Sequence, residues 1–561
     1  MFNPSRSIRS LAANIPITQR RPTGPPLTRH LAQRNFCFCR ATSSRQHHRV
    51  KQQRSALDPV YLLVAGVVSV GIAFVASAYN TTDKSIEEES TALSQVFAPV
   101  AEDWQSCPAV MAANMPPGRP GNLTADQEAK LKEMWAATLD VFGVAHETPE
   151  ASTNGTSTPV SEATTDGGKK KHKSRLSLFK KTKDRHGTDG AATMDGEGND
   201  KHGQQKEYQQ ALASQSPEQL REAFWSMVKH DHPDALLLRF LRARKWDVHA
   251  ALVMLISTMH WRSQEMHVDD DVMARGEMHA LRESKASGAA EKKEGADFMA
   301  QLRMGKSYLH GCDKDGRPLC VVRVRLHKQG EQSEKSLERF TVYTIETARM
   351  LLRPPVDTAT IVFDMTDFTM ANMDYTPVKF MIKCFEANYP ESLGSVLVYK
   401  SPWLFQGIWK IIRGWLDPVV AAKVHFASNV DELSEWIPKA QIPAELGGAE
   451  QWRYEYVEPR EGENDAMSDS AAQEKVQSER TELVKSYEHE VSAWCNGEGS
   501  GEGRMRLAQR LSENYWKLDP YVRARSLYDR TNVLQPGGRL ELYPRAGGGS
   551  GGGGDDDGGV D

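Results

Sequence analysis

The stretch that decides the fold is TATIVFDMTDF, residues 358–368, an apolar and β-branched run typical of a buried strand. It is followed by DYTPVKFMIKCFEANYP (374–390), where Pro377 near the start favours a helix, and then by a second apolar strand, GSVLVYKS (394–401). An earlier strand, GRPLCVVRVRL (316–326), follows a turn signal, and a helix is expected over 336–352. Strands that alternate with helices predict an α/β fold with a mostly parallel sheet.

Helical patterns flank this region, and compositional breaks divide the chain. We assign 120–144 and 205–294 to an N-terminal helical lobe, with 266–300 helical or irregular. Residues 295–452 form the α/β lobe, and 453–545 an acidic helical extension. The insert 145–204 is too polar to form a core, so we expect disorder there and in the tail 546–561. Within the insert, KKKHKSRLSLFKK (169–181) suits either an anionic membrane surface or solvent.

The first eighty residues predict a targeting segment followed by a membrane anchor. Residues 1–57 hold ten arginines and one lysine but no Asp or Glu, the composition of a mitochondrial presequence. Residues 58–80 include an uncharged run long enough to cross a bilayer core of roughly 30 Å as a transmembrane helix, and 81–119 resemble a linker. We therefore expect a membrane-anchored mitochondrial protein. The endoplasmic reticulum and the cytosolic side of the outer membrane are the alternatives, and a buried helix is the alternative for the span itself.

The sequence offers no signature of an enzyme, a metal site or a nucleic-acid-binding protein. Nucleophile-elbow, phosphate-loop and zinc-protease motifs are absent, so no catalytic residue is assigned. The seven cysteines form no CxxC pair, and neither a metal nor a cofactor is expected. The net charge of −4 gives no reason to expect nucleic acid. Asp364 and Asp367 follow a strand, where α/β sheets often hold ligands, but either can equally cap the next helix.

One segment is more apolar than a surface helix requires. In SPWLFQGIWKIIRGWLDP (401–418), Ser401 is placed to cap a helix, Pro402 to occupy its first position and Asp417 to end it. Its apolar side chains fill an arc of roughly 160°, wider than the stripe of about 100° that one packed face needs. They are Leu404, Phe405, Ile408, Trp409, Ile411, Ile412, Trp415 and Leu416. Either the helix belongs to the core, or it covers an apolar cavity and meets a membrane when it moves.

Two charges near this segment favour the cavity. VVAAKVHF (419–426) places Lys423 alone on an otherwise apolar helix, and NYPESLG (388–394) places Glu391 just before a buried strand. Burying a charge is costly unless the charge is paired. A Lys–Glu pair that meets a polar ligand head would satisfy both groups, and a structural salt bridge is the alternative.

Six motifs follow one another along the chain: PGNL, LLLRFLRARKWDV, IVFDMTDFTMANMDY, YPESLG, LDPVVAAK and IPAELGG. In this order they resemble the CRAL-TRIO lipid-binding family, and most of all its fungal phosphatidylinositol transfer proteins. The resemblance implies a helical lobe before an α/β lobe whose sheet floors a deep apolar pocket for one lipid, closed by a mobile gate helix at 402–416. It also implies a head-group site of Arg244, Lys245, Glu391 and Lys423, in which the cations meet a phosphate and the carboxylate accepts inositol hydroxyls.

Val420 departs from the family pattern, which commonly places a hydroxyl residue after DPV. The lost hydrogen bond is expected to weaken head-group binding by about 0.5–1.5 kcal/mol. The expected function is non-enzymatic transfer of one phospholipid, phosphatidylinositol, between membrane surfaces. The alternatives are a membrane-tethered adaptor that senses a lipid, and a carrier of another apolar ligand such as a sterol precursor. The sequence identifies no protein partner.

Overall fold

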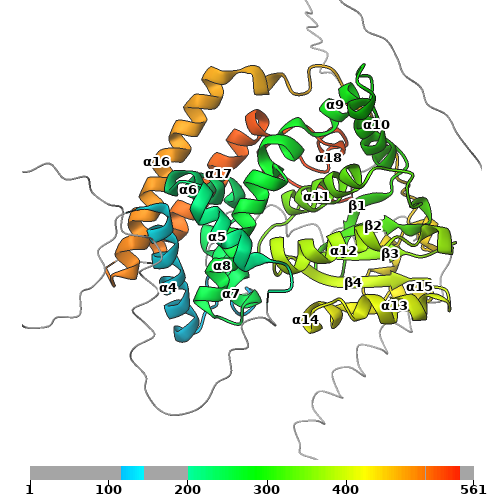
Figure 1. Ribbon diagram of the computed structural model, residues 1–561, viewed down its shortest axis with the longest axis horizontal. Helices are drawn as coiled ribbons and strands as arrows, with labels where there is room; N and C mark the ends of the chain where they lie inside the picture. The colour runs from blue at the N-terminus through cyan, green and yellow to red at the C-terminus, as the bar shows by residue number, and fades with distance from the viewer. Residues whose placement is uncertain (1–114, 145–199, 499–500, 544–561) are drawn as a thin grey trace, which may run out of the picture. The chain divides into compact units, whose positions relative to one another are not determined.

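The computed structural model describes residues 115–144, 200–498 and 501–543 (Figure 1). Several expected segments therefore lie outside the described residues. They are the basic segment 1–57, the span 58–80, most of the linker 81–119, nearly all of the insert 145–204 and the tail 546–561.

Five helices build the N-terminal lobe. They are α4 (Ala125–Phe142), α5 (Gln204–Ser214), α6 (Pro217–Val228), α7 (Pro233–Ala243) and α8 (Val248–His260). Local sequence determines where α4 and α6 begin, because Thr124 and Ser216 form capping boxes with the glutamines three residues further on. The apolar faces of the helices meet around Trp135 and Phe224, whose rings pack edge to face 5.6 Å apart.

The C-terminal extension completes this same core. Its two long helices, α16 (Ser470–Cys495) and α17 (Gly501–Val522), bring Leu483, Val491 and Leu511 into the apolar cluster of the N-terminal lobe. The buried Asp234 joins the two segments, since its carboxylate accepts hydrogen bonds from Trp135 Nε1 at 2.7 Å and from the Tyr487 hydroxyl at 2.9 Å. The first lobe is thus built from both ends of the described chain.

Four helical segments connect this lobe to the sheet. They are two short π-helices, η3 (Trp261–Glu265) and η4 (Val268–Met273), followed by α9 (Ala274–Glu283) and α10 (Ala289–Arg303). The stretch 266–300 is accordingly helical for most of its length.

The second lobe contains a five-stranded sheet in the order β1-β2-β3-β4-β5. The strands are β1 (Ser307–Cys312), β2 (Pro318–Arg323), β3 (Ala359–Asp364), β4 (Leu393–Tyr399) and β5 (Val424–Ala427). Only β1 is antiparallel to its neighbour, so the sheet is mostly parallel, as predicted. The helices between the strands are α11 (Glu334–Met350), α12 (Tyr375–Lys383), η7 (Cys384–Asn388), α13 (Phe405–Arg413) and α14 (Pro418–Ala421).

Two strands differ from the sequence prediction. Strand β1 was not predicted, because SYLHGC contains polar and small residues that hide its alternation. The helix expected over 419–426 is wrong: α14 ends at Ala421, and β5 begins at Val424, which pairs with Val396 of β4. The open edge of β4 offers backbone hydrogen bonds that outweigh the helical pattern of so short a segment. Lys423 therefore lies at the junction of a helix and a strand.

The two faces of the sheet have different neighbours. On one face, Leu319, Val362 and Leu397 pack against the segment that contains α15 (Val430–Leu433) and continues to Leu446. On the other face, Phe363 and Val398 line a pocket together with residues of α11, α12 and α13. Alternate side chains of each strand point to opposite faces, so the apolar runs of β2, β3 and β4 supply both layers.

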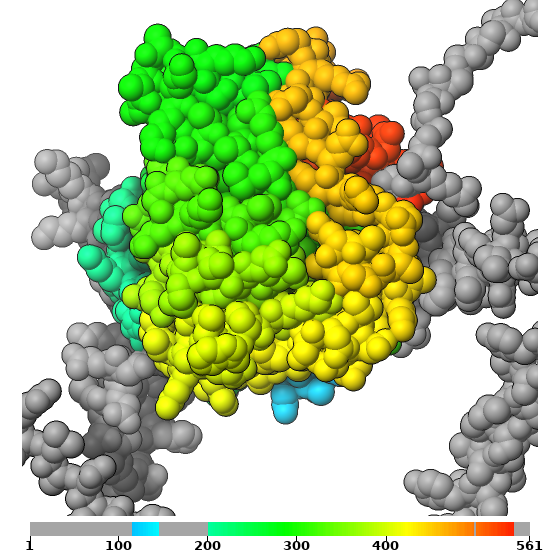
Figure 2. All heavy atoms as spheres, turned by 90° about the vertical axis from the view of Figure 1, so that its right-hand side faces the viewer, coloured from blue at the N-terminus to red at the C-terminus, as the bar shows by residue number. Residues whose placement is uncertain are grey.

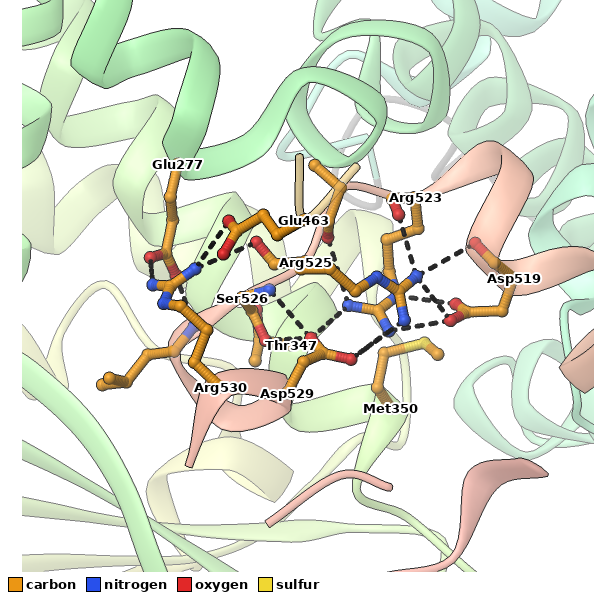
Figure 3. A network of polar contacts seen from close by, with 12 residues as sticks. Glu277, Thr347, Met350, Glu463, Asp519, Arg523, Arg525, Ser526, Asp529 and Arg530 are labelled. Carbon is orange, nitrogen blue, oxygen red and sulfur yellow. Dashed lines mark hydrogen bonds and ion pairs between the residues drawn. The ribbon is translucent and has the colours of Figure 1, made fainter. Parts of the chain in front are cut away.

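A polar network attaches the C-terminal segment to α9 (Figure 3). Arg523 pairs with Asp519 at 2.6 Å and with Asp529 at 2.8 Å, while Arg530 pairs with Glu463 at 3.1 Å and with the fully buried Glu277. Such buried charges are tolerated because each has an opposite charge and further hydrogen bonds. The network therefore fixes the position of α18 (Leu527–Arg530) and of the chain that follows it.

The expectation of a membrane-anchored, mitochondrial protein with a transmembrane helix requires correction. Among the described residues, no helix combines the length and the apolar character needed to cross a bilayer. The span 58–80 on which the expectation rested lies outside the described residues. We therefore withdraw the anchor and the location derived from it.

Candidate functional site

An apolar pocket lies between the sheet and α13. Its floor is formed by side chains of β2, β3 and β4, its walls by α11 and α12, and one side by α13 and the residues that follow it. The pocket holds about 1360 Å³ of space that no protein atom fills, part of which belongs to its mouth. Most of the side chains that line this space are apolar, so it suits an apolar ligand.

Helix α13 has one face in the pocket and one in solvent. Phe405, Trp409 and Ile412 line the pocket, together with Leu416 just beyond the helix. The opposite side carries Ile411, which is 49% exposed, and the preceding turn carries Trp403, which is 86% exposed. Figure 2 shows the segment that contains α13 and α14, in yellow, at the lower surface of the described residues. The helix thus covers a cavity and presents apolar side chains outward.

The remaining residues of the expected gate helix occupy other positions. Ile408 is buried in the core, and the ring of Trp415 packs edge to face on Tyr375 at 5.3 Å. The helix is also shorter than predicted, since Leu404 takes the N-cap position and Ser401 does not cap it. Asp417 caps α14 instead, by accepting a hydrogen bond from the Val419 amide at 2.8 Å.

Glu391 and Lys423 lie together at the end of the sheet where strands β4 and β5 begin. The Lys423 Nζ atom is 3.7 Å from the Glu391 carboxylate and donates a hydrogen bond to the Leu393 carbonyl at 2.8 Å. Glu391 has a φ of 53°, in the left-handed region that side chains rarely adopt, and such strain often accompanies a functional position. The structure pairs the two residues, and their role at a head group stays a prediction.

Arg244 and Lys245 follow the end of α7 and do not join this pair. Arg244 donates a hydrogen bond to the Gln204 side chain, and burial lowers the pKa of its guanidinium. Lys245 is exposed, in a turn where its φ is 51°. Among the described residues, no ion pair links either cation to Glu391 or Lys423. Two of the four predicted head-group residues are thus brought together and two are not.

Sequence reasoning missed two other arginines of α7, one of which contacts the backbone of Glu391. Arg239 donates a hydrogen bond to the Glu391 carbonyl at 2.8 Å, and Arg242 pairs with Asp357 at 3.2 Å. Burial is the main cause that lowers the pKa of Arg242 to about 10, and the carboxylate of Glu391 acts in the opposite direction. The first arginine of the RARK motif, rather than the second, is therefore on the Glu391 side.

A polar contact that we call the α13 latch lies at the end of the expected gate segment, residues 402–416. The Glu386 carboxylate in η7 accepts hydrogen bonds from the Asp417 amide at 2.6 Å, from Lys201 at 2.6 Å and from His202 at 2.8 Å. Lys201 also donates to the Trp415 carbonyl. Hydrogen bonds from His202 and Lys201 lower the pKa of Glu386, although burial acts to raise it most strongly. Residues assigned to the insert thus contact the end of the gate segment.

A second cluster of polar side chains lies at the opposite end of the sheet, where strands β2 and β3 end. Lys306, His327 and Asp374 all line the pocket there. Lys306 Nζ donates to Gln332 Oε1 at 2.6 Å and lies 3.3 Å from His327 Nδ1, and His327 Nε2 lies 3.3 Å from Asp374. Burial lowers the pKa of Lys306 to about 8. The pocket wall therefore has a polar group at this end, whereas at the other end its lining includes Leu393 and Val424, next to Glu391 and Lys423 in the chain but not these two residues themselves.

Metal ligands are not grouped in the part of the chain that the structure describes. No set of three His, Cys, Asp or Glu side chains there is placed to hold an ion.

Comparison with known proteins finds two matching family models. Residues 302–448 match the CRAL/TRIO domain, and residues 206–257 match the CRAL/TRIO N-terminal domain. A CRAL-TRIO domain-containing protein of Schizosaccharomyces pombe is 42% identical over 431 residues, which covers 75% of this chain and 93% of that protein. The phosphatidylinositol transfer protein CSR1 of Eremothecium gossypii is 37% identical over 452 residues, covering 76% of this chain and 100% of that protein. Among solved structures, the crystal structure of Sfh5 aligns with a TM-score of 0.32 and 16% identity, covering 44% of this chain and 77% of that chain.

Proposed function

The chain belongs to the CRAL/TRIO family, and from this premise we propose that it binds one phosphatidylinositol molecule in the pocket beneath α13 and transfers it between membranes. The family and its relatives support lipid binding and transfer. The observation that carries the proposal is the pocket itself, which is predominantly apolar and covered by a helix with apolar side chains on both its inner and outer sides. Such a site favours acyl chains, because burying them releases water from apolar surface.

The head group is proposed to bind at Glu391 and Lys423. The pocket residues Leu393, Val420 and Val424 are near neighbours of this pair in the chain, so acyl chains in the pocket would leave a polar head at this edge. The lysine is a suitable partner for a phosphate, and the carboxylate for inositol hydroxyls. Arg242 is a better placed second cation than Arg244 or Lys245, because it lies on the Glu391 side of the motif.

Helix α13 is proposed to be the gate. When it moves away from the sheet, Phe405, Trp409 and Ile412 would lose the pocket as their apolar partner. A bilayer surface can replace that partner, and the exposed Trp403 and Ile411 provide the first contact with it. Opening at a membrane therefore costs less than opening in water.

The test is transfer of fluorescent phosphatidylinositol from donor to acceptor vesicles by the full-length protein. We expect Lys423→Ala to lower transfer by about tenfold, since a charge-assisted hydrogen bond contributes about 1.5–3 kcal/mol. Lys439→Ala is the matched control, because Lys439 is an exposed lysine paired with Asp431 at 2.8 Å, away from the pocket lining. A wild-type protein that moves no inositol lipid would refute the proposal.

The same experiment separates the carrier from its alternatives. Val420 lines the pocket with an apolar side chain, which favours a wholly apolar ligand such as a sterol precursor if inositol lipids are not bound. Lipid that binds but never reaches acceptor vesicles would indicate a sensing adaptor. Lipid recovered with a cleaved ester bond would indicate an enzyme.

A further inference from the structure

The inner polar end of the pocket contains a buried cation without a carboxylate partner. Lys306 is only 6% exposed, and among the described residues it forms no ion pair. The buried lysine Lys229, by contrast, is paired with Asp269 at 2.6 Å. The two contacts of the Lys306 ammonium are neutral acceptors, Gln332 and His327, and an ammonium has three hydrogens to donate. One donor and one positive charge are therefore available at the wall of the cavity.

An unpartnered acceptor accompanies this donor. Gln301 is fully buried and lines the pocket, and its Oε1 atom has no hydrogen-bond partner, whereas its Nε2 donates to the Ser336 hydroxyl at 3.1 Å. The two residues are neighbours, because the Lys306 amide donates to the Gln301 carbonyl at 3.0 Å. A buried polar atom without a partner is unfavourable unless a ligand or water satisfies it. The site thus lacks one acceptor for Lys306 and one donor for Gln301.

We propose that the inner polar end of the pocket, formed by Lys306 and Gln301, binds the phosphate monoester head group of an acidic lipid such as phosphatidic acid. An oxygen of the monoanion would accept from Lys306, and its remaining P–OH would donate to Gln301. A carboxylate shares the negative charge but has no hydroxyl to donate when ionised, which favours the phosphate. The inference rests on the proposed lipid-carrier function and assigns a second ligand class to the same pocket.

The polar end of the pocket at Lys306 and the proposed head-group site at Glu391 lie at opposite ends of the strands. All strands from β2 to β5 are parallel, and Lys306 and His327 lie where β2 ends, whereas Glu391 and Lys423 lie where β4 and β5 begin. A strand of six residues spans roughly 20 Å. Gln332, which holds Lys306, also lines a second, smaller surface pocket beside α11. A head group at Lys306 would therefore lie at the opposite end of the strands from Glu391 and Lys423.

The charges around Lys306 also predict how binding depends on pH. Burial lowers the pKa of Lys306 to about 8, whereas Glu331, Asp297 and Asp374 act to raise it. The neighbouring His327 has a lowered pKa, chiefly because of burial, and contributes no positive charge near neutral pH. An anion favours the charged form of the lysine. Affinity for the phosphate should accordingly fall in two steps, first when the monoester loses its P–OH at about pH 6 and again as the pH rises above about 8, where Lys306 loses its charge.

The experiment compares two lipids and two variants of the full-length protein. Phosphatidylcholine vesicles contain either fluorescent phosphatidic acid or fluorescent phosphatidylinositol, and protein-bound lipid is measured after the vesicles are removed. We expect Lys306→Met to reduce bound phosphatidic acid at least about tenfold with little effect on phosphatidylinositol, and Lys423→Ala to do the reverse. Lys328→Met is the matched control, because Lys328 is an exposed lysine next to His327. The midpoint of thermal unfolding verifies that each variant is folded.

The outcomes distinguish this inference from the proposed function. Binding of phosphatidylinositol but not phosphatidic acid overturns the inference and leaves the function intact, whereas the opposite result overturns the function and supports the inference. Equal loss of both lipids in Lys306→Met overturns the two-site assignment. Competition by inorganic phosphate alone would identify a free-anion site, and competition by oleate at the same concentration would identify a carboxylate site; both results overturn the phosphatidic acid assignment. Loss of the step above about pH 8 in Lys306→Met supports it.

Discussion

Replacing Glu386 with glutamine should speed the exchange of bound lipid, because it weakens the α13 latch. The carboxylate is buried, with its side chain only 6% exposed, and it accepts hydrogen bonds from the Asp417 amide, Lys201 and His202. Glutamine has nearly the same shape but no charge, and its amide group is a donor that faces other donors. The substitution therefore removes the attraction while leaving the packing of η7 unchanged.

The size of the effect follows from the individual contacts. The buried bond to the Asp417 amide should contribute about 1.5–3 kcal/mol, since its acceptor is charged. The Lys201 contact adds about 0–1 kcal/mol, because that lysine is 46% exposed and screened by solvent. A loss of about 2–3 kcal/mol corresponds to an increase of roughly 30- to 150-fold in the population of an open gate. We expect the exchange rate to rise by at least tenfold if opening limits exchange.

The assay is the rate at which fluorescent lipid leaves the preloaded protein for acceptor vesicles. Glu488→Gln is the matched control: Glu488 is 5% exposed and accepts comparable bonds from Arg221 at 2.7 Å and Trp225 at 2.8 Å, but it lies in the helical lobe. Both variants should unfold at lower temperature, and only Glu386→Gln should exchange faster. An unchanged rate in a folded Glu386→Gln protein would refute the latch.

Acid should act in the same direction as the Glu386→Gln substitution. The pKa of Glu386 is lowered from its ordinary value of 4.5 in the folded protein. The stability that this carboxylate contributes is therefore present above pH 4.5 and is lost as the pH falls through the lowered pKa. The variant lacks the titrating group, so it should lose this part of the acid sensitivity.

Two further predictions concern head-group affinity and the C-terminal attachment. Val420→Thr should strengthen phosphatidylinositol binding by about 0.5–1.5 kcal/mol, measured by lipid titration, because it restores a hydroxyl at the pocket wall; weaker binding would contradict the head-group position. Glu277→Gln should lower the free energy of unfolding in urea by about 3–5 kcal/mol, because it leaves the buried Arg530 with only Glu463 as its charged partner. A loss below about 1 kcal/mol would show that the network of Figure 3 contributes little to stability.

Local sequence was sufficient to predict the alternating part of the fold. Residues 358–368 and 394–401 are apolar over a strand length, and the helix between them has its own start signals, so a parallel β–α–β unit follows from neighbouring residues. The wide apolar arc of 401–418 left a core helix and the cover of a cavity as alternatives, and in the structure one side of α13 lines the pocket. Because burying an unpaired charge is costly, the sequence suggested that Glu391 pairs with Lys423. The structure places the two charged groups 3.7 Å apart.

Only the tertiary structure decided which distant groups meet. The α13 latch joins Lys201, Glu386 and Asp417 from three segments, and neither a motif nor a period in the sequence relates them. The packing of α7 brings Arg239 to the Glu391 carbonyl, whereas Arg244, just after the helix, bonds to Gln204. The edge of β4 converts the segment after Ala421 into a strand. The periodicity of apolar residues predicts which side chains are buried, because each helix or strand buries the side chains of one face. Which side chains become partners depends on how several elements pack, and that packing is a property of the whole chain.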